Sequence, residues 1–168
     1  YVLAGARWAN VFAGYSKTLD QIVPDYSVDW QFVPPWGDDF SFVFTTRGCP
    51  NHCNYCAVAR IEKGQWCNPI WRDCILDEKP AVLLEDNNFS SAPISHVEAV
   101  LDFLHEKKKL VNFDSGVDCK YVTPGIAKKL GRLKFIFSGM RVGFDRITDD
   151  GKYQRAIELL KKSGVKSS

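Results

Sequence analysis

The chain has 168 residues, of which 45% are hydrophobic and 25% charged, and its formal net charge is +2. This is the composition of a globular domain, and a charge so close to zero gives no electrostatic signal for nucleic-acid binding. No apolar run approaches the roughly 20 residues that a membrane-spanning helix needs, and no signal peptide is visible, so the sequence predicts no membrane association.

Residues 1–38 are rich in aromatic side chains and are interrupted by prolines and a glycine. Their pattern predicts one helix, from Ala6 to Leu19, followed by extended chain with turns. We interpret residues 1–38 as the remnant of an upstream domain plus a linker, and residues 39–168 as the core. Both ends of the chain fall within strand-like or turn-like sequence, and we therefore expect a piece of a longer protein.

Strand and helix patterns alternate after residue 38. Three runs rich in aliphatic, β-branched or aromatic residues predict strands at 40–45, 81–85 and 110–114. A fourth strand has two candidates, 133–137 and 140–144, and we favour the second.

Helices are predicted after the second, third and fourth strands. Ser95 is a candidate N-cap of the first helix, Thr123-Pro124 opens the next, and Gly164 ends the last. Repeated strand–helix units predict an α/β fold with a parallel sheet. In such sheets ligands gather at the carboxyl ends of the strands. The sequence places there a cysteine-rich loop and the polar turns Asp86-Asn87-Asn88 and Asp114-Ser115.

Three of the six cysteines crowd into the loop after the first predicted strand, namely Cys49, Cys53 and Cys56. Thiolates at this spacing can hold three corners of a cubic iron–sulfur cluster and leave the fourth iron open to a cofactor or substrate. The crowding favours a reduced, cytoplasmic protein with a metal cluster over a disulfide framework. The alternatives are a disulfide, a ferredoxin-like electron carrier and a structural zinc site completed by Cys67, Cys74 or His52.

The segment Thr46–Cys56, with its CxxxCxxC spacing and an aromatic residue before the last cysteine, resembles the signature of radical S-adenosylmethionine enzymes. The similarity covers roughly residues 40–168. It implies a partial (β/α)6 TIM-like barrel with about four βα units present, and a [4Fe-4S] cluster on Cys49, Cys53 and Cys56. It also implies that S-adenosylmethionine binds the open iron and is cleaved by one electron to methionine and a 5′-deoxyadenosyl radical.

The resemblance further implies partners. An electron donor of the flavodoxin or ferredoxin type would reduce the cluster, and the substrate is not identified. The segments Val23–Ser27, Asp86–Phe89 and Phe113–Asp118 resemble a subgroup that often carries an upstream cobalamin-binding-like domain. Cobalamin is therefore expected only in a longer protein. We expect these 168 residues alone to be inactive, because further barrel units would supply the substrate contacts.

The family pattern also assigns cofactor contacts. Tyr55 occupies the aromatic position that lies beside the adenine, with core packing as the alternative role. Many members carry Gly-Gly-Glu after the second strand, whereas this chain has Glu85 followed by Asp86, Asn87 and Asn88, whose side-chain oxygens could receive the methionine ammonium group. A plain turn is the alternative. Asp114 and Ser115 are candidates for the ribose or a carboxylate, with a plain turn as the alternative, and Arg141 is a candidate partner of the cofactor carboxylate.

Overall fold

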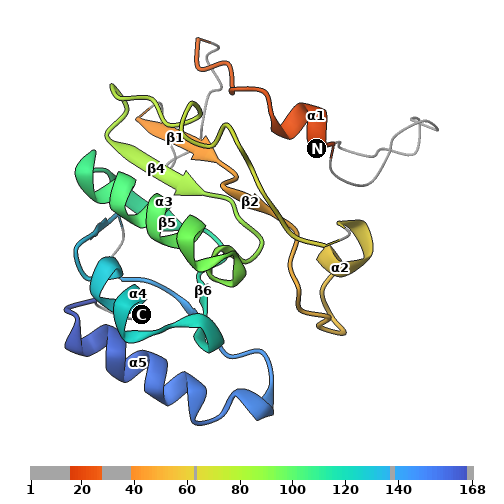
Figure 1. Ribbon diagram of the computed structural model, residues 1–168, viewed down its shortest axis with the longest axis vertical. Helices are drawn as coiled ribbons and strands as arrows, with labels where there is room; N and C mark the ends of the chain where they lie inside the picture. Colours follow the sequence, from red (N-terminus) through yellow and green to blue (C-terminus); the bar gives the residue numbers. More distant parts are fainter. Residues whose placement is uncertain (1–15, 28–38, 63, 137–138, 166–168) are drawn as a thin grey trace.

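The computed structural model describes residues 16–27, 39–62, 64–136 and 139–165. Its main sheet has four parallel strands in the order β1-β4-β5-β7 (Figure 1). These strands are β1 (Phe40–Val43), β4 (Ala81–Leu84), β5 (Leu110–Phe113) and β7 (Lys134–Phe135). Phe40 lies opposite Ala81, and Ala81 lies opposite Leu110, so the first three strands end level with one another. The predicted parallel α/β sheet is confirmed.

Two small sheets extend beyond the carboxyl ends of the main strands. In one, β2 (Thr46–Arg47) pairs antiparallel with β3 (Trp66–Cys67). In the other, β6 (Val117–Asp118) pairs parallel with β8 (Val142–Gly143). The strands β2 and β6 continue the chain beyond the carboxyl ends of β1 and β5, which is the side of the main sheet where the candidate site lies.

The fourth strand of the main sheet differs from the one that we favoured. The position beside β5 is taken by β7, which lies in the 133–137 run, whereas the favoured 140–144 run contains β8, which pairs with β6. The connection from the preceding helix to β7 is very short, and Gly131 sits so close to Ser163 that any Cβ would collide with its carbonyl oxygen. The chain therefore re-enters the sheet at the first apolar run that it reaches.

The described helices are mostly short. The longer ones are α3 (Ile94–Glu106), α4 (Pro124–Leu130) and α5 (Lys152–Lys162); the others are α1 (Lys17–Asp20), α2 (Val58–Ile61) and the 3₁₀ turns η1 (Phe89–Ser91), η2 (Cys119–Tyr121) and η3 (Ile147–Asp149). None of the helices in the described ranges is long and apolar enough to cross a bilayer.

The helix boundaries follow capping chemistry in two of three predicted cases. Thr123 caps α4 by accepting the Ile126 N–H at 3.2 Å, with Pro124 at the first helical position. Gly164, at a φ of 84°, follows the end of α5 as predicted. Ser95 was the wrong N-cap, because α3 already begins at Ile94, directly after Pro93. The predicted 6–19 helix falls largely outside the described residues, which contain only α1 at its end.

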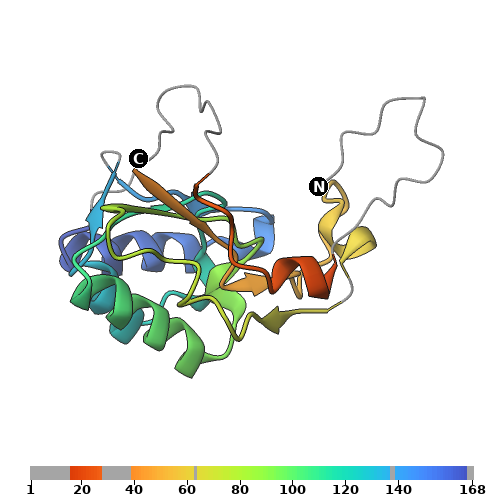
Figure 2. The same cartoon turned by 90° about the horizontal axis from the view of Figure 1, so that it is seen from above.

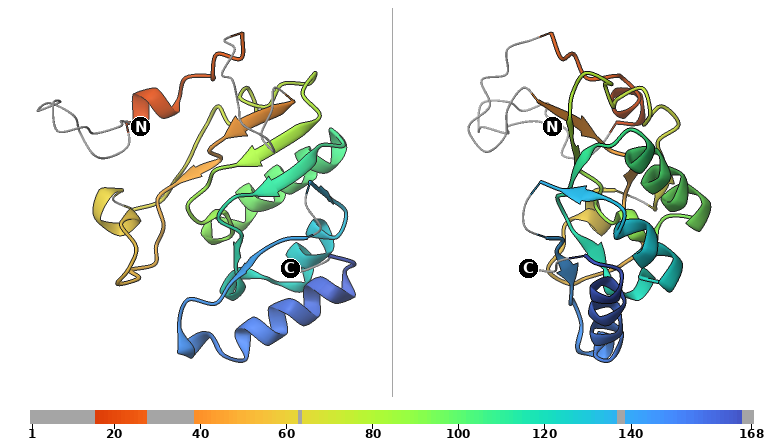
Figure 3. Two further views of the ribbon diagram at one scale, coloured as in Figure 1. Left: turned by 180° about the vertical axis from the view of Figure 1, so that it is seen from behind. Right: turned by 90° about the vertical axis from the view of Figure 1, so that its left-hand side faces the viewer.

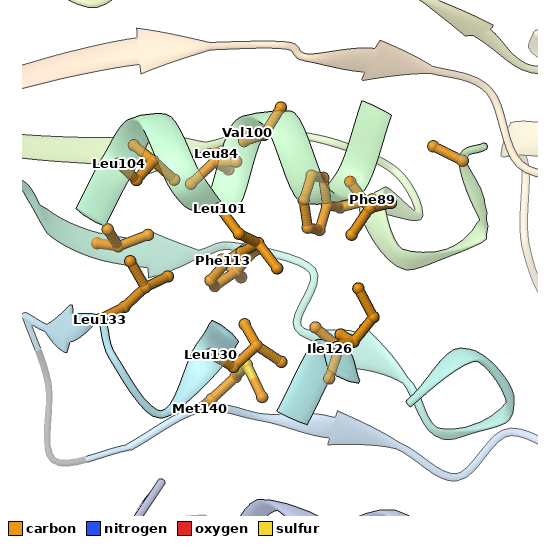
Figure 4. Close-up of a cluster of buried hydrophobic side chains, with 14 of the residues drawn as sticks. Leu84, Phe89, Val100, Leu101, Leu104, Phe113, Ile126, Leu130, Leu133 and Met140 are labelled. Carbon is orange, nitrogen blue, oxygen red and sulfur yellow. The ribbon is translucent and has the colours of Figure 1, made fainter. Parts of the chain in front are cut away.

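The hydrophobic core lies between the sheet and the helices. Helices α3 and α4 cover one face of the main sheet, as seen in Figures 2 and 3. Leu101 of α3 and Leu130 of α4 lie next to Phe113 of β5, with Leu104 further along α3 (Figure 4), and all four side chains are at most 4% exposed. Full burial of one such side chain stabilises the fold by about 1.5–3 kcal/mol. This layer fixes the positions at which the strands end.

Tyr26 attaches the segment before the sheet to the outer edge of β1. Its hydroxyl accepts the Phe42 N–H at 2.8 Å and lies 3.0 Å and 3.2 Å from the carbonyl oxygens of Cys74 and Phe42, to which it can donate. Burial raises the pKa of Tyr26 to about 12, so the hydroxyl keeps its proton at neutral pH. The Val23–Ser27 segment thus has a structural role in this fold.

Candidate metal and cofactor site

The cysteine loop leaves β2 through a turn that only glycine tolerates. Gly48 has a φ of 80°, and a Cβ at this position would collide with the carbonyl oxygen of Gly64. The Gly48 N–H lies 2.8 Å from Oε2 of Glu62 and 3.0 Å from Oδ1 of Asn87, and both oxygens accept from it. The turn therefore places Cys49 next to the chain that follows β4.

Arg47, the residue before Gly48, holds this turn in place through ion pairs. Its side chain is buried, with Nη2 2.9 Å from Oε1 of Glu62 and Nε 3.1 Å from Oδ2 of Asp20. The guanidinium also lies over the ring of Phe44, 4.1 Å from its centroid. Arg47 ties the start of the loop to two other segments, which makes it an anchor of the loop.

The three cysteines of the loop are free and partly exposed. The backbone N–H of Asn51 donates to Sγ of Cys49 at 3.4 Å, and Nδ2 of Asn88 donates to the same sulfur at 3.5 Å. Such N–H···S contacts are typical surroundings of iron–sulfur ligands. Within the described ranges, no three Cys, His, Asp or Glu side chains are gathered closely enough to hold a metal ion. The loop thus supplies three thiols as possible ligands, but their sulfur atoms are not gathered around one point.

The other cysteines lie elsewhere in the fold. None of the six is in a disulfide, which removes that alternative. Cys74 and Cys119 are each 3% exposed in the hydrophobic core, and Cys67 lies in β3. Burial raises the pKa of the Cys74 thiol to about 11. Cys74 therefore packs as a small apolar side chain, which weakens the zinc interpretation.

The turn after β4 lies against the cysteine loop, but its three polar residues differ in their roles. Asp86 is buried, and its carboxylate accepts hydrogen bonds from both hydroxyls and both backbone N–H groups of Thr45 and Thr46. Burial raises the pKa of Asp86 to about 6. Asp86 holds the end of β1 to the end of β4, and its contact with a cofactor stays a prediction. Asn87 and Asn88 contact the loop itself, at Gly48 and Cys49.

Tyr55 is on the surface of the loop. Its side chain is 74% exposed, which excludes the core-packing alternative. The hydroxyl donates to Oδ1 of Asp145 at 2.9 Å, and this hydrogen bond raises the pKa of Tyr55. The contact joins the cysteine loop to the segment after β8. The predicted place of Tyr55 beside an adenine stays a prediction.

Asp114, Ser115 and Arg141 lie after β5 and before β8. Arg141 was expected near the start of the fourth strand of the main sheet, but it precedes β8 instead. Its Nη2 donates to the carbonyl oxygen of Asp114 and lies 3.6 Å from Oδ1 of the same residue. All three side chains are exposed. The structure therefore gathers Asp114 and Arg141 into one pair, apart from the contacts around Cys49.

The sequence prediction missed three residues that contact this region, namely Asn51, Asp118 and Lys120. Asp118 is 8% exposed, and its Oδ2 accepts from Nδ2 of Asn51 at 2.9 Å and from Nδ2 of Asn88 at 3.2 Å. The available signal was the Phe113–Asp118 segment, in which a glycine turn separates two short apolar pieces. That pattern ends one strand and starts another, and β6 brings Asp118 back to the loop.

Comparisons with known proteins bear on the fold. No family model matches this sequence, and no curated protein matches it. Solved structures do match it. Two of them are of the radical S-adenosylmethionine methyltransferase TsrM from Kitasatospora setae: one with tryptophan substrate and the S-adenosylmethionine analogue aza-SAM bound, the other with cobalamin and a [4Fe-4S] cluster bound. Each superposes with a TM-score of 0.60 and 13% sequence identity over 76% of this chain.

The shared feature is the fold. The match covers 29% and 28% of the two TsrM chains, so this chain spans less than a third of their length. Together with the parallel sheet, the superposition establishes a mixed α/β fold of the partial TIM-like type expected from the sequence.

Proposed function

We propose that this chain is the cluster-binding part of a radical S-adenosylmethionine enzyme, with Cys49, Cys53 and Cys56 as the three protein ligands of a [4Fe-4S] cluster. The observation that carries the proposal is the position of the CxxxCxxC loop. It follows β1, the first strand of the main sheet, and the short strand β2, in a chain whose fold matches that of TsrM, a radical S-adenosylmethionine methyltransferase.

The donor set of the loop fits such a cluster. Three free thiols lie on one loop at the carboxyl end of the sheet, and two N–H groups already face the sulfur of Cys49. Thiolates are the ligands of iron–sulfur clusters, and hydrogen bonds to sulfur tune their potentials. When bound, the cluster supplies the electron for reductive cleavage of S-adenosylmethionine.

In this proposal the chain's own residues bind and orient the cofactor. Asn87 and Asn88 lie against the loop. Their amide oxygens accept from the Gly48 N–H and the Ser90 hydroxyl, and each keeps a second lone pair for the methionine ammonium group. Tyr55 presents an exposed ring for the adenine, and Asp114, Ser115 and Arg141 offer polar groups for the ribose or carboxylate. An electron donor of the flavodoxin or ferredoxin type is proposed as a partner, and cobalamin as a cofactor of a longer protein only.

The decisive experiment is anaerobic reconstitution with iron and sulfide. We expect about four irons and four sulfides per chain, and an electron paramagnetic resonance signal of the reduced sample that changes when S-adenosylmethionine is added. Stoichiometric zinc without iron would support a structural zinc module instead. An iron signal that does not respond to S-adenosylmethionine would contradict the cofactor assignment.

A matched pair of variants tests the ligand assignment. Cys53→Ala should abolish retention of iron and sulfide, because it removes one of only three ligands. Cys119→Ala should retain both, because Cys119 is 3% exposed in the hydrophobic core. Equal loss of iron in the two variants would contradict the assignment, provided that circular dichroism shows both to be folded.

A further inference from the structure

A partly buried cluster of polar side chains lies beside the cysteine loop, and its central residue, Asp118, has no role in the proposed function. We call it the Asp118 cluster; it consists of Asn51, Asn88, Asp118 and Lys120. Oδ2 of Asp118 accepts from Nδ2 of Asn51 at 2.9 Å, from Nδ2 of Asn88 at 3.2 Å and from Nζ of Lys120 at 3.1 Å. One carboxylate oxygen thus joins three segments of the chain.

Both asparagines of the cluster also donate to Cys49. Asn88 uses the same Nδ2 for Asp118 and for Sγ of Cys49, while its Oδ1 accepts from the Ser90 hydroxyl at 3.0 Å. An amide nitrogen carries two hydrogens, one for each acceptor. Asp118 and Ser90 together fix the orientation of the Asn88 amide, so that its second N–H faces the sulfur.

Asn51 is held in a similar way. Its side-chain Oδ1 accepts from Nζ of Lys120 at 3.0 Å and its Nδ2 donates to Asp118, so both ends of the amide are engaged. This fixes the residue whose backbone N–H lies 3.4 Å from Sγ of Cys49. Two different N–H groups therefore depend on Asp118 for their aim at one sulfur.

Asp118 is itself rigidly placed. It lies in β6 opposite Gly143 of β8, and its backbone N–H donates to the Ser90 hydroxyl at 2.9 Å. Gly116, at a φ of 72°, allows the approach to Arg141 that this pairing needs, since a Cβ there would come within 2.7 Å of the Arg141 carbonyl oxygen. The carboxylate is thus held by backbone on a second small sheet, independently of the loop that it contacts.

We propose that Asp118 is a positioning residue that aims the Asn51 and Asn88 N–H groups at the Cys49 thiolate and thereby sets the reduction potential of the cluster. The inference rests on the proposed function. N–H groups directed at a ligand sulfur stabilise the extra negative charge of the reduced cluster and so raise its potential. The charge of Asp118 acts in the opposite direction, and the ammonium of Lys120 partly compensates it.

A double-mutant cycle separates positioning from charge. The midpoint potential of the reconstituted protein is measured for the unsubstituted chain, Asn88→Ala, Asp118→Ala and the double variant. In the unsubstituted background, Asn88→Ala should make reduction about tenfold less favourable, which for one electron is ~59 mV. In the Asp118→Ala background, the same substitution should shift the potential by less than a third of that amount.

Additive shifts would overturn the inference, because a carboxylate that acts only through its charge leaves the effect of Asn88→Ala unchanged. Asp77→Ala is the matched control: it removes a carboxylate of the same charge outside the cluster and outside the proposed cofactor site, and Asn88→Ala should keep its full effect in that background. Should Asp118→Ala fail to fold, Asp118→Asn gives the complementary test: its amide oxygen still accepts from the two asparagine amides, so Asn88→Ala should keep most of its shift in that background. An Asn88→Ala shift that falls below a third of its original size in the Asp118→Asn background would overturn the positioning role. Failure of the unsubstituted chain to take up iron would contradict the proposed function instead.

Discussion

Where α3 packs on the main sheet, Leu101 and Leu104 are 1% and 0% exposed, whereas the three cysteines of the loop after β2 remain partly open to solvent. The first region is stabilised by apolar burial, which acts through many small contacts. The loop is held by a few directed polar contacts, such as those of Gly48 and Asn51. The comparison teaches that the scaffold, meaning the main sheet and the helices packed on it, is stabilised by its own buried side chains. The conformation of the loop depends on single hydrogen bonds and, in our proposal, on its metal.

The largest effect is expected in the scaffold. Leu101→Ala should lower the free energy of unfolding by about 3–5 kcal/mol, because it removes a buried side chain and leaves a cavity. Ile147→Ala, at a side chain that is 87% exposed, should change it by less than about 0.5 kcal/mol. Urea titration followed by circular dichroism measures both. A loss at Leu101 as small as that at Ile147 would break the comparison, because the core would then not stabilise the scaffold.

The next effect should be confined to the loop. Gly48→Ala combines an unfavourable positive φ with a collision against the Gly64 carbonyl, and we expect it to cost about 2–3 kcal/mol and to halve iron retention at least. Gly64→Ala has a similar φ of 75° with nothing within 4 Å of the added Cβ, so it should cost about 1 kcal/mol and retain iron. Thermal unfolding and iron analysis distinguish the two. Equal behaviour would show that backbone strain, and not the close contact, governs the turn.

The smallest effect lies at the junction of the two regions, where Asp86 joins β1 to β4. Its pKa is raised from 3.8 to about 6 by burial, so the folded protein binds a proton that the unfolded chain releases. The resulting stabilisation is full below the unfolded pKa of 3.8 and is lost as the pH rises through about 6. Between pH 7 and pH 5 the unfolding free energy should rise by about 1 kcal/mol from this group.

Asp86→Asn provides the comparison for the pH effect. The variant should be less stable than the unsubstituted chain at pH 5, because an amide cannot accept all of the hydrogen bonds from Thr45 and Thr46, and the difference should shrink toward pH 7. Its stability curve should lack the rise of the unsubstituted chain toward pH 5, as measured by chemical denaturation at several pH values. Parallel curves for the two proteins would place the titration elsewhere.

The scaffold could be predicted well from the sequence. The strands β1, β4 and β5 begin at the predicted residues Phe40, Ala81 and Leu110. Continuous apolar runs such as 81–84 report burial on both faces, and all four residues of β4 are indeed buried. Local pattern was sufficient here because the elements are stabilised by the side chains that form the pattern.

The features that the sequence did not predict depend on contacts between residues that are distant in the sequence. The 140–144 run looked like a main-sheet strand, yet its partner is β6, a two-residue strand too short to recognise. Asp118 was missed for the same reason, since only its pairing with Asn51 and Asn88, 67 and 30 residues away, gives it a role. Arg141 was misplaced together with its strand. Polar contacts across such separations leave no periodic signal.

The attachment of Tyr26 has a consequence for how this molecule meets its neighbours. An outermost strand normally offers free backbone groups on which another polypeptide can build, which is a common start of aggregation. At Phe42 the outward N–H and C=O are already engaged by a phenol. An incoming chain would have to displace residues 25–27 before it could extend the sheet there, so a segment that precedes the core protects it against unwanted self-assembly.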